Sequence, residues 1–425
     1  MTTAVLPPPA AASAEFFLSR YQGLTNRLPG SAGLRRGAAD ILRTLGLPTT
    51  RDEAWRYTSL VKLSEARFHE ALTDTGGFGW DDDFSGFEGL PRLVFAQGRF
   101  SAAESVLPEK ARVASFAHRA DFGTLARPDH ERLVALNTML AEDGAIIDVE
   151  AGVDAGAMLL VSLGRDLHGT ATAFHPRHAI RLAAGARATI IEIARGHGEY
   201  LHNPVMEIVL GAGAQLTHVR LQNEGKAAYH LATIYADVGQ AASYDSFTLS
   251  TGAHLARTEV HARLHGAGGH VAINAAQLLR GTQHSDFTTV VRHEAPGCAS
   301  RQTVKHVLAG HARGVFQGKI EVARAAQKTD GYQMNQALLL SPDAEIDCKP
   351  QLEIFADDVK CSHGATVGEL DADQMFYLVS RGIPNAEAKA LLVRAFLGEA
   401  LDMVTDERAR RMLDDVIDAW WAVPA

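Results

Sequence analysis

Cys361 and His363 stand two residues apart in the segment from Asp357 to Thr366. In a β-strand both side chains would point to the same face. A thiolate and an imidazole suit iron, zinc or copper better than magnesium or calcium. The pair is two ligands short of a closed metal site. The alternative is a strand whose inward positions are Val359, Cys361 and His363, with the cysteine acting as a small apolar residue. Residue types alone favour this packing interpretation.

Other motifs that could support chemistry are incomplete. The run from Gly314 to Ile320 imitates a phosphate-binding loop, but it is one residue short, and Ile320 stands where a magnesium-binding Ser or Thr is required. We therefore expect no ATP on this chain. Several of the 19 histidines lie around Cys298, but not at a standard metal-ligand spacing, so we assign them no role.

The segment 1–140 is predicted to be mainly helical. Apolar residues recur at spacings of three and four between Leu34 and Leu45, which indicates an amphipathic helix, and Pro48 follows to end it. Met1 to Ala12 has no basic residue and contains three prolines, so it does not look like a secretory signal. We expect it to be a disordered tail.

The segment 141–370 is predicted to be a β-solenoid core. Its short apolar segments are separated by glycines, and the spacing loosens after Gly268, with similar turns at Gly310 and Ser341. A period of this size is typical of stacked coils, whereas a β-sandwich, the alternative, shows turns every 8 to 12 residues or so. The glycines that we take as equivalent turn positions recur at intervals of 26 to 29 residues: Gly185, Gly213, Gly239 and Gly268.

The segment 371–425 is predicted to form a C-terminal helical domain of two helices. One apolar stripe runs from Ala388 to Phe396, and a second runs from Ala409 to Trp421 after a capping candidate at Thr405 and Asp406. The tryptophan end of the second stripe could pack on the solenoid or bind a partner, and packing is the favoured interpretation.

Composition excludes several classes of protein. The 425 residues carry a net charge of -9, which argues against a dominant surface for nucleic acid or anionic membranes. No apolar run is long enough to cross a bilayer. Three cysteines make a disulfide framework unlikely and a reducing compartment the better fit, so we expect a cytoplasmic protein.

From Arg301 onward the sequence closely resembles the SufB/SufD family of iron-sulfur cluster assembly proteins, and within it the SufD branch. Glu53 to Thr58 and Ala135 to Asn137 extend the resemblance upstream. The segments that carry the resemblance are Phe316 to Ile320, Ala326 to Asp330, Leu338 to Ser341, Lys349 to Ile354, Asp357 to Gly368, Gln374 to Leu378 and Ser380 to Ile383.

The resemblance implies a mainly β fold, a right-handed parallel β-helix flanked by N-terminal and C-terminal α-helical regions. It also implies a non-catalytic scaffold that pairs with SufB through the β-helices and binds the ATPase SufC through its C-terminal helices. The residues expected to contact SufC are Arg381, Gly382, Leu392 and Phe396. The isolated chain could form a homodimer.

The family's SufD contributes a histidine to the SufB/SufD interface, where a nascent iron-sulfur cluster forms, and His363 matches that position. His363 is therefore the expected metal ligand, on a transient cluster shared with SufB, and Cys361 is the weaker candidate. Histidine ligation makes a cluster more labile or higher in potential than cysteine alone, which would suit a transferable cluster.

One departure separates the two branches of the family. SufB carries an acceptor cysteine ahead of its proline-containing strand, whereas Ala344 to Asp347 contains none, and Cys348 lies nearby but not at that position. This favours the SufD branch and argues against an enzyme that accepts sulfur. The rival hypothesis is a carbohydrate-active β-helix enzyme, which needs a cluster of carboxylates or calcium ligands in one groove.

Overall fold

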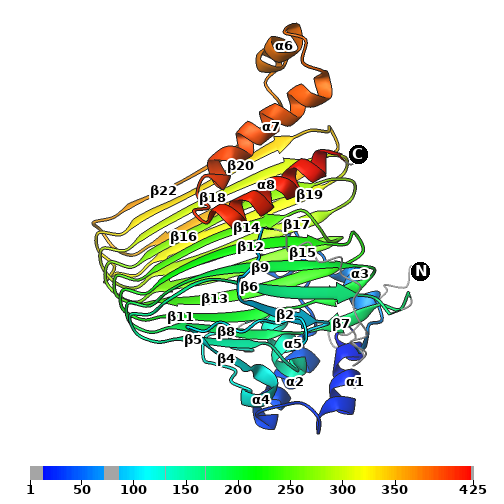
Figure 1. Cartoon of the computed structure of the whole chain (residues 1–425), viewed down its shortest axis with the longest axis vertical. Helices are drawn as coiled ribbons and strands as arrows, with labels where there is room; N and C mark the ends of the chain where they lie inside the picture. The colour runs from blue at the N-terminus through cyan, green and yellow to red at the C-terminus, as the bar shows by residue number, and fades with distance from the viewer. Residues whose placement is uncertain (1–12, 71–85, 130, 168, 423–425) are drawn as a thin grey trace, which may run out of the picture.

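The computed structural model describes residues 13–70, 86–129, 131–167 and 169–422, so the tail expected at 1–12 lies outside the described residues. The chain forms a parallel β-solenoid with helices at both ends (Figure 1). The solenoid prediction is confirmed, and the β-sandwich alternative is wrong because successive coils pair through parallel strands.

Two sheets form the walls of the solenoid. The twelve-stranded sheet has the order β21 (Glu345–Ile354), β19 (Arg313–Val322), β17 (His284–His293), β15 (Leu255–Leu264), β13 (Tyr229–Val238), β11 (Val205–Leu210), β8 (Arg177–Leu182), β5 (Ala145–Val149) and β4 (Arg112–Ser115). Attached to it are β1 (His69–Glu70), β7 (Thr172–Phe174) and β10 (Tyr200–His202).

The ten-stranded sheet forms the opposite wall. Its order is β22 (Lys360–Gly368), β20 (Asp330–Leu339), β18 (Ala299–Leu308), β16 (His270–Leu279), β14 (Ser243–Ser250), β12 (Gln215–Glu224), β9 (Arg187–His197), β6 (Asp154–Arg165), β2 (Arg92–Ala96) and β3 (Arg99–Phe100). Antiparallel pairing occurs where β3 meets β2 and where β4 meets β5.

Because neighbouring strands pair in a constant register, apolar residues lie over apolar residues in columns along the solenoid. Ile180, Ile208 and Ala236 are aligned on neighbouring strands and all are buried. Alternate residues of each strand point inward, so these columns form the apolar core between the two sheets. Each fully buried Ile or Leu contributes about 1.5 to 3 kcal/mol to folding.

The turn period is more regular than the sequence suggested. Gly185, Gly213 and Gly268 have φ near +70° as expected, but the equivalent position in the coil between them is Ala241, with φ +50°, and not Gly239. Gly239 is instead required because a Cβ there would lie 2.7 Å from a backbone oxygen of the preceding coil. The period also continues beyond Gly268, through Gly297 and Lys328, and Gly310 belongs to a different corner.

The N-terminal region packs helices on one end of the solenoid. At the start of α2 the Ser31 hydroxyl accepts a hydrogen bond from the Leu34 backbone N–H, and at its end Gly46 adopts φ +65°. The helix predicted between Leu34 and Leu45 is confirmed. The region also contributes β1 to β4 to the sheets. Its helices are α1 (Glu15–Leu24), α2 (Ala32–Leu45), the 3₁₀ helix η2 (Glu53–Trp55), α3 (Val61–Glu65), α4 (Phe116–Arg119) and α5 (Arg132–Leu140).

Three helices, one more than predicted, follow the last strand: α6 (Ala372–Ser380), α7 (Asn385–Leu401) and α8 (Glu407–Ala422). Helix α8 lies along the outer face of the ten-stranded sheet, and α6 projects beyond the solenoid (Figure 1). Trp420 and Trp421 pack against the apolar cluster under α8, so packing is confirmed for this end of the stripe. No helix in the described residues has the length and apolarity needed to span a membrane.

Candidate functional site

The C-terminal end of the solenoid is open. Strand β22 pairs only with β20, and β21 only with β19, in the described part of the chain. Most side chains of β22 are exposed, whereas nearly all those of β15, in the middle of the stack, are buried. An unpaired strand edge exposes backbone N–H and C=O groups that can pair with another chain. This end therefore has the geometry of an interface.

His363 lies on the exposed face of this open coil. It is in register with Gln333 of β20, which is fully buried, so His363 occupies an interior column that no further coil covers. The strand pattern predicted from the sequence is confirmed, but the His363 side chain is exposed rather than packed. An exposed imidazole at an unpaired edge can bind a metal ion together with ligands from another chain.

Cys361 shares the face of His363 but is half-buried. Its side chain packs against a small apolar cluster that includes Ile320 and Ala356. Opposite it lies Gly331, where a Cβ would come within 3.3 Å of the sulfur, so the glycine leaves room for the thiol. Burial raises the pKa of the Cys361 thiol, which disfavours the thiolate that binds metals. The structure thus gives Cys361 a packing role alongside any role as a ligand.

The other two cysteines differ in exposure. Cys348 lies on β21 at the same open end, half-buried over Phe316, and burial raises the pKa of its thiol to about 11 although Asn335 opposes the shift. Cys298 is fully buried, and its sulfur lies 3.3 Å from the carbonyl oxygen of Gly266. Cys298 is therefore a structural residue, whereas Cys348 is close enough to the surface to be considered with His363.

The open end does not hold a complete metal site. Among the described residues, no third ligand forms with Cys361 and His363 a cluster compact enough to hold an ion. Their roles as cluster ligands stay predictions. An incomplete ligand set at an unpaired edge is what a site shared between two chains would look like in one of them.

A second candidate surface lies on α6 and α7. No residue of α6 is buried, and Phe376 and Tyr377 are 74% and 55% exposed. A shallow groove on this surface is lined by Asp373, Gln374, Tyr377, Leu378 and Leu392. Exposed aromatic residues of this kind concentrate at protein interfaces.

The four residues expected to contact SufC fall into two groups. Arg381 lies 3.5 Å from the centroid of the exposed Tyr377 ring and is followed by Gly382 (φ +87°), while Leu392 lines the groove itself. Phe396 faces the solenoid instead, where the buried Lys305 ammonium lies 4.5 Å from its ring. Phe396 thus fixes α7 to the sheet. The segment Gln374 to Leu378 carried the resemblance, but no interface was assigned to its aromatic residues from the sequence.

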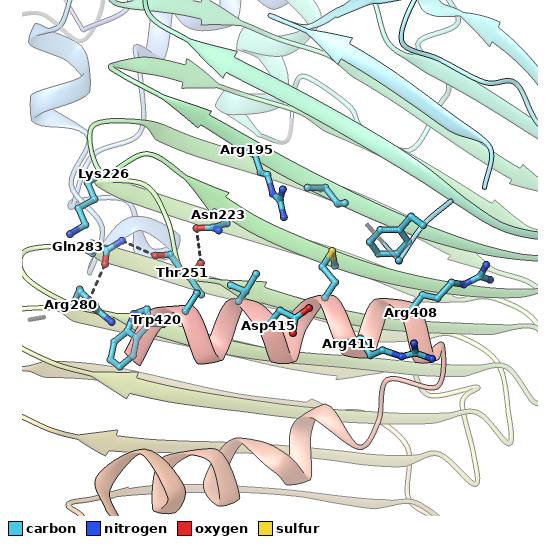
Figure 2. Close-up of a pocket in the computed structure, with 16 residues that line it drawn as sticks. Arg195, Asn223, Lys226, Thr251, Arg280, Gln283, Arg408, Arg411, Asp415 and Trp420 are labelled. Atoms are coloured by element: carbon cyan, nitrogen blue, oxygen red, sulfur yellow. Dashed lines mark hydrogen bonds between the residues drawn. The ribbon is translucent and has the colours of Figure 1, made fainter. Parts of the chain in front are cut away.

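A groove of about 670 Å³ runs along α8, beside the apolar residues that pack this helix on the ten-stranded sheet (Figure 2). The carboxylate among its lining residues is Asp415, surrounded by more numerous cations. Sequence patterns could not reveal this groove because its residues come from six separate parts of the chain. The cations are Arg195, Lys226, Arg280, Arg408 and Arg411.

Known proteins of one family match this sequence over most of its length. The family model described as SUF system FeS cluster assembly, SufBD core domain, matches residues 165–396. An iron-sulfur cluster assembly SufBD family protein of Synechocystis is 33% identical over 87% of this chain and 86% of its own length. Iron-sulfur cluster assembly protein SufD of Escherichia coli is 33% identical over 88% and 89% of the two chains. The chloroplastic protein ABCI7 of Arabidopsis thaliana is 28% identical over 94% and 90%.

Proposed function

Because the chain belongs to the SufBD family of iron-sulfur cluster assembly proteins, we propose that it is the SufD-type scaffold subunit of a SufB, SufC and SufD complex. It pairs with SufB, binds the ATPase SufC and has no catalytic activity of its own. The observation that carries this proposal is the open coil at β21 and β22, which presents His363 with an incomplete ligand set.

The open end supports pairing with a second solenoid. A partner strand can continue each sheet beyond β21 or β22, because parallel coils of the same kind already stack on the other side of these strands. Such pairing would bury His363 and bring the partner's ligands to it. In the absence of SufB the same edges can pair with a second copy of this chain, so a homodimer of the isolated protein would form through them.

The surface of α6 supports a separate partner. Helix α6, which carries the exposed Phe376 and Tyr377, projects beyond the last coils of the solenoid (Figure 1). It offers SufC a helical surface distinct from the strand edges of β21 and β22 that we assign to SufB. Lys305 also forms an ion pair with Glu399 of α7, which fixes the helices to the ten-stranded sheet. A movement of SufC can therefore reach the ten-stranded sheet, of which β22 with His363 is the last strand, through α7.

Co-expression with SufB and SufC tests the assembly. The full chain should co-purify with both proteins, and Phe376→Ala with Tyr377→Ala should release SufC while retaining SufB. Replacing Val61, an equally exposed apolar residue of α3, by Ala is the matched control and should retain both partners. Failure of the wild-type chain to enter a complex would overturn the scaffold function.

Iron content tests the site. His363→Ala should lower the iron recovered on the complex after anaerobic reconstitution without changing its stoichiometry. His311→Ala, which removes another exposed histidine from a turn of the solenoid, should leave the iron unchanged. Equal iron on the His363→Ala complex would reduce His363 to a strand-end residue.

The groove argues against the carbohydrate-active alternative. A glycosidase places a pair of carboxylates across the scissile bond. The groove under α8 has a single carboxylate, Asp415, among its described lining residues, and its cations give it the opposite charge. Nothing in this groove supports glycoside hydrolysis.

A further inference from the structure

Three ligand-type side chains meet inside the solenoid, far along the stack from the open end. They are His202 of β10, Glu224 at the end of β12 and His230 of β13. At most 3% of any of the three is exposed. Because β10 pairs with β13 and His202 is in register with His230, the two imidazoles are neighbours, with ring centroids 4.9 Å apart.

The Glu224 carboxylate is shared between the two imidazoles. Its Oε1 lies 3.1 Å from Nδ1 of His202, and its Oε2 lies 2.7 Å from Nδ1 of His230. Gln222 donates a hydrogen bond of 2.9 Å to Oε2 and so fixes the orientation of the carboxylate. One ligand atom from each of the three side chains lies within 4.8 Å of the others.

Hydrogen bonds account for only part of this arrangement, namely the contacts of Glu224 with Nδ1 of His202 and with Gln222. In the described structure, neither nitrogen of His230 has a hydrogen-bond partner, and neither does Nε2 of His202. The 2.7 Å approach of His230 to Glu224 thus lacks the alignment of a hydrogen bond. Two ligands of one metal ion come this close, at about 3 Å, because the lone pairs of both point at the ion and not at each other.

A neighbouring cluster shows what is missing around Glu224. Glu192 is equally buried and contacts a histidine, His218, at 3.0 Å, but it also accepts a hydrogen bond of 2.8 Å from Arg220. That guanidinium neutralises the carboxylate permanently. The other compact group of ligand-type residues, around Glu259, likewise has Arg257 at 3.0 Å.

Glu224 has imidazoles where Glu192 has a guanidinium. Among the described residues, the ion-pair partners of the buried Glu224 carboxylate are His202 and His230, and no arginine or lysine pairs with it. A buried carboxylate without a permanent countercharge is strongly unfavourable. A bound cation would supply that charge.

We propose that His202, Glu224 and His230 bind a divalent transition-metal ion, Fe²⁺ or Zn²⁺, inside the solenoid. Two imidazoles with one carboxylate suit these ions, whereas magnesium and calcium prefer ligand sets made of oxygen atoms. Three protein ligands leave a coordination position for water. The ion is distinct from any cluster at His363, because the two sites lie on different coils of the stack.

Burial also dictates how the ion is bound. The ligands come from two successive coils and have no exposed atoms of consequence, so the ion enters while the coils assemble. We therefore expect a chelator to remove it from the unfolded chain but not from the folded protein. Metal present during refolding should raise Tm.

The test uses the full chain and Co²⁺ alone as the probe. The protein is unfolded with chelator, refolded with or without Co²⁺, and freed of unbound ion by gel filtration. We expect about one Co²⁺ per chain, visible d–d absorption and a higher Tm than in protein refolded without metal. If the wild-type chain refolds with no bound Co²⁺ and an unchanged Tm, the proposal is wrong, whatever the variants do.

Variants locate the ion. Glu224→Gln and His230→Asn should lower bound Co²⁺ at least tenfold. The matched variants Glu192→Gln and His218→Asn, in the cluster that has its own arginine, should retain it, and so should His363→Ala. Loss of Co²⁺ in His363→Ala with retention in Glu224→Gln would place the ion at the open end and overturn the proposal.

Discussion

The two ends of the solenoid are built from the same coils but are covered differently. At the N-terminal end the chain folds its own helices over the strands, and residues such as Phe68 and Leu136 are completely buried. At the C-terminal end β22 is largely exposed, although the strand before it in the sheet is not. The comparison shows that one end is covered by the chain's own helices, whereas the strand edges of β21 and β22 have no covering strand in the described residues.

The largest expected effect distinguishes stability at the two ends. Phe68 lies between the rings of Phe17 and Tyr229, at centroid distances of 6.2 and 6.1 Å. Phe68→Ala should lower the free energy of unfolding by about 3 to 5 kcal/mol. Val367→Ala at the open end, where the side chain is 54% exposed, should change it by about 0.5 kcal/mol or less. Denaturant unfolding measures both, and equal losses would contradict the comparison.

The second prediction is a loss of stability at mildly acid pH, which buried histidines should cause equally at both ends. Burial lowers the pKa of His178, near the covered end, and of His306, toward the open end, to about 4 in each case. Unfolded histidine has a pKa of about 6.5, so below that pH the unfolded chain binds protons first and stability falls. Each of these histidines should lower the free energy of unfolding by about 2 kcal/mol when the pH falls from 6.5 to 5.

Tm measured across this pH range tests the histidine prediction. His178→Gln and His306→Gln should each flatten the dependence of Tm on pH. His311→Gln, at an exposed turn, is the control and should leave the profile unchanged. A profile that is flat in the wild-type protein would show that these imidazoles are not buried as neutral groups.

A proline in β22 should impair only the open edge. The Lys360 amide donates to Thr329 of the neighbouring coil, and alternation along the strand directs the Ala365 N–H outward. Ala365→Pro should therefore weaken SufB binding at least tenfold, about 1.4 kcal/mol, with little change in Tm. Ala365→Ser keeps the N–H and should bind normally. Undiminished binding of the proline variant would show that SufB does not pair with this edge.

The smallest effect separates packing from ligation at the open end. Cys361→Ala should lower the free energy of unfolding by about 1 kcal/mol, because the sulfur is only half-buried, and should leave the iron of the complex unchanged. Cys298→Ala, at a fully buried site, should lower the free energy of unfolding by more than Cys361→Ala does. Loss of iron in Cys361→Ala would make the thiol a ligand beside His363.

The fold was largely predictable because glycines recur at nearly regular intervals at the turns of the solenoid. The misassigned turn at Gly239 shows the limit: Ala241 adopts the positive φ there, and a non-glycine residue in this conformation leaves no signal in the sequence. Helix α6 was missed for a different reason. Its apolar residues are consecutive, from Met375 to Val379, and so lack the spacing of three and four that indicates a helix.

The candidate sites were predictable only where strand alternation suffices. The shared face of Cys361 and His363 followed from their spacing of two. Their exposure could not, because nothing in a strand's sequence shows that it is the last of a stack. His202 and Glu224 are 22 residues apart, and only the register between coils brings them together.

The constant register of the coils makes the length of the solenoid a modular quantity. From β15 to β19 each coil repeats after 29 residues, and every residue lies over its equivalent in the coil before. Deleting a whole coil would join two surfaces that already match, whereas deleting one residue from a strand would turn its apolar side chains outward. The distance between the helices at the two ends can therefore change only in steps of one coil, about 4.8 Å each.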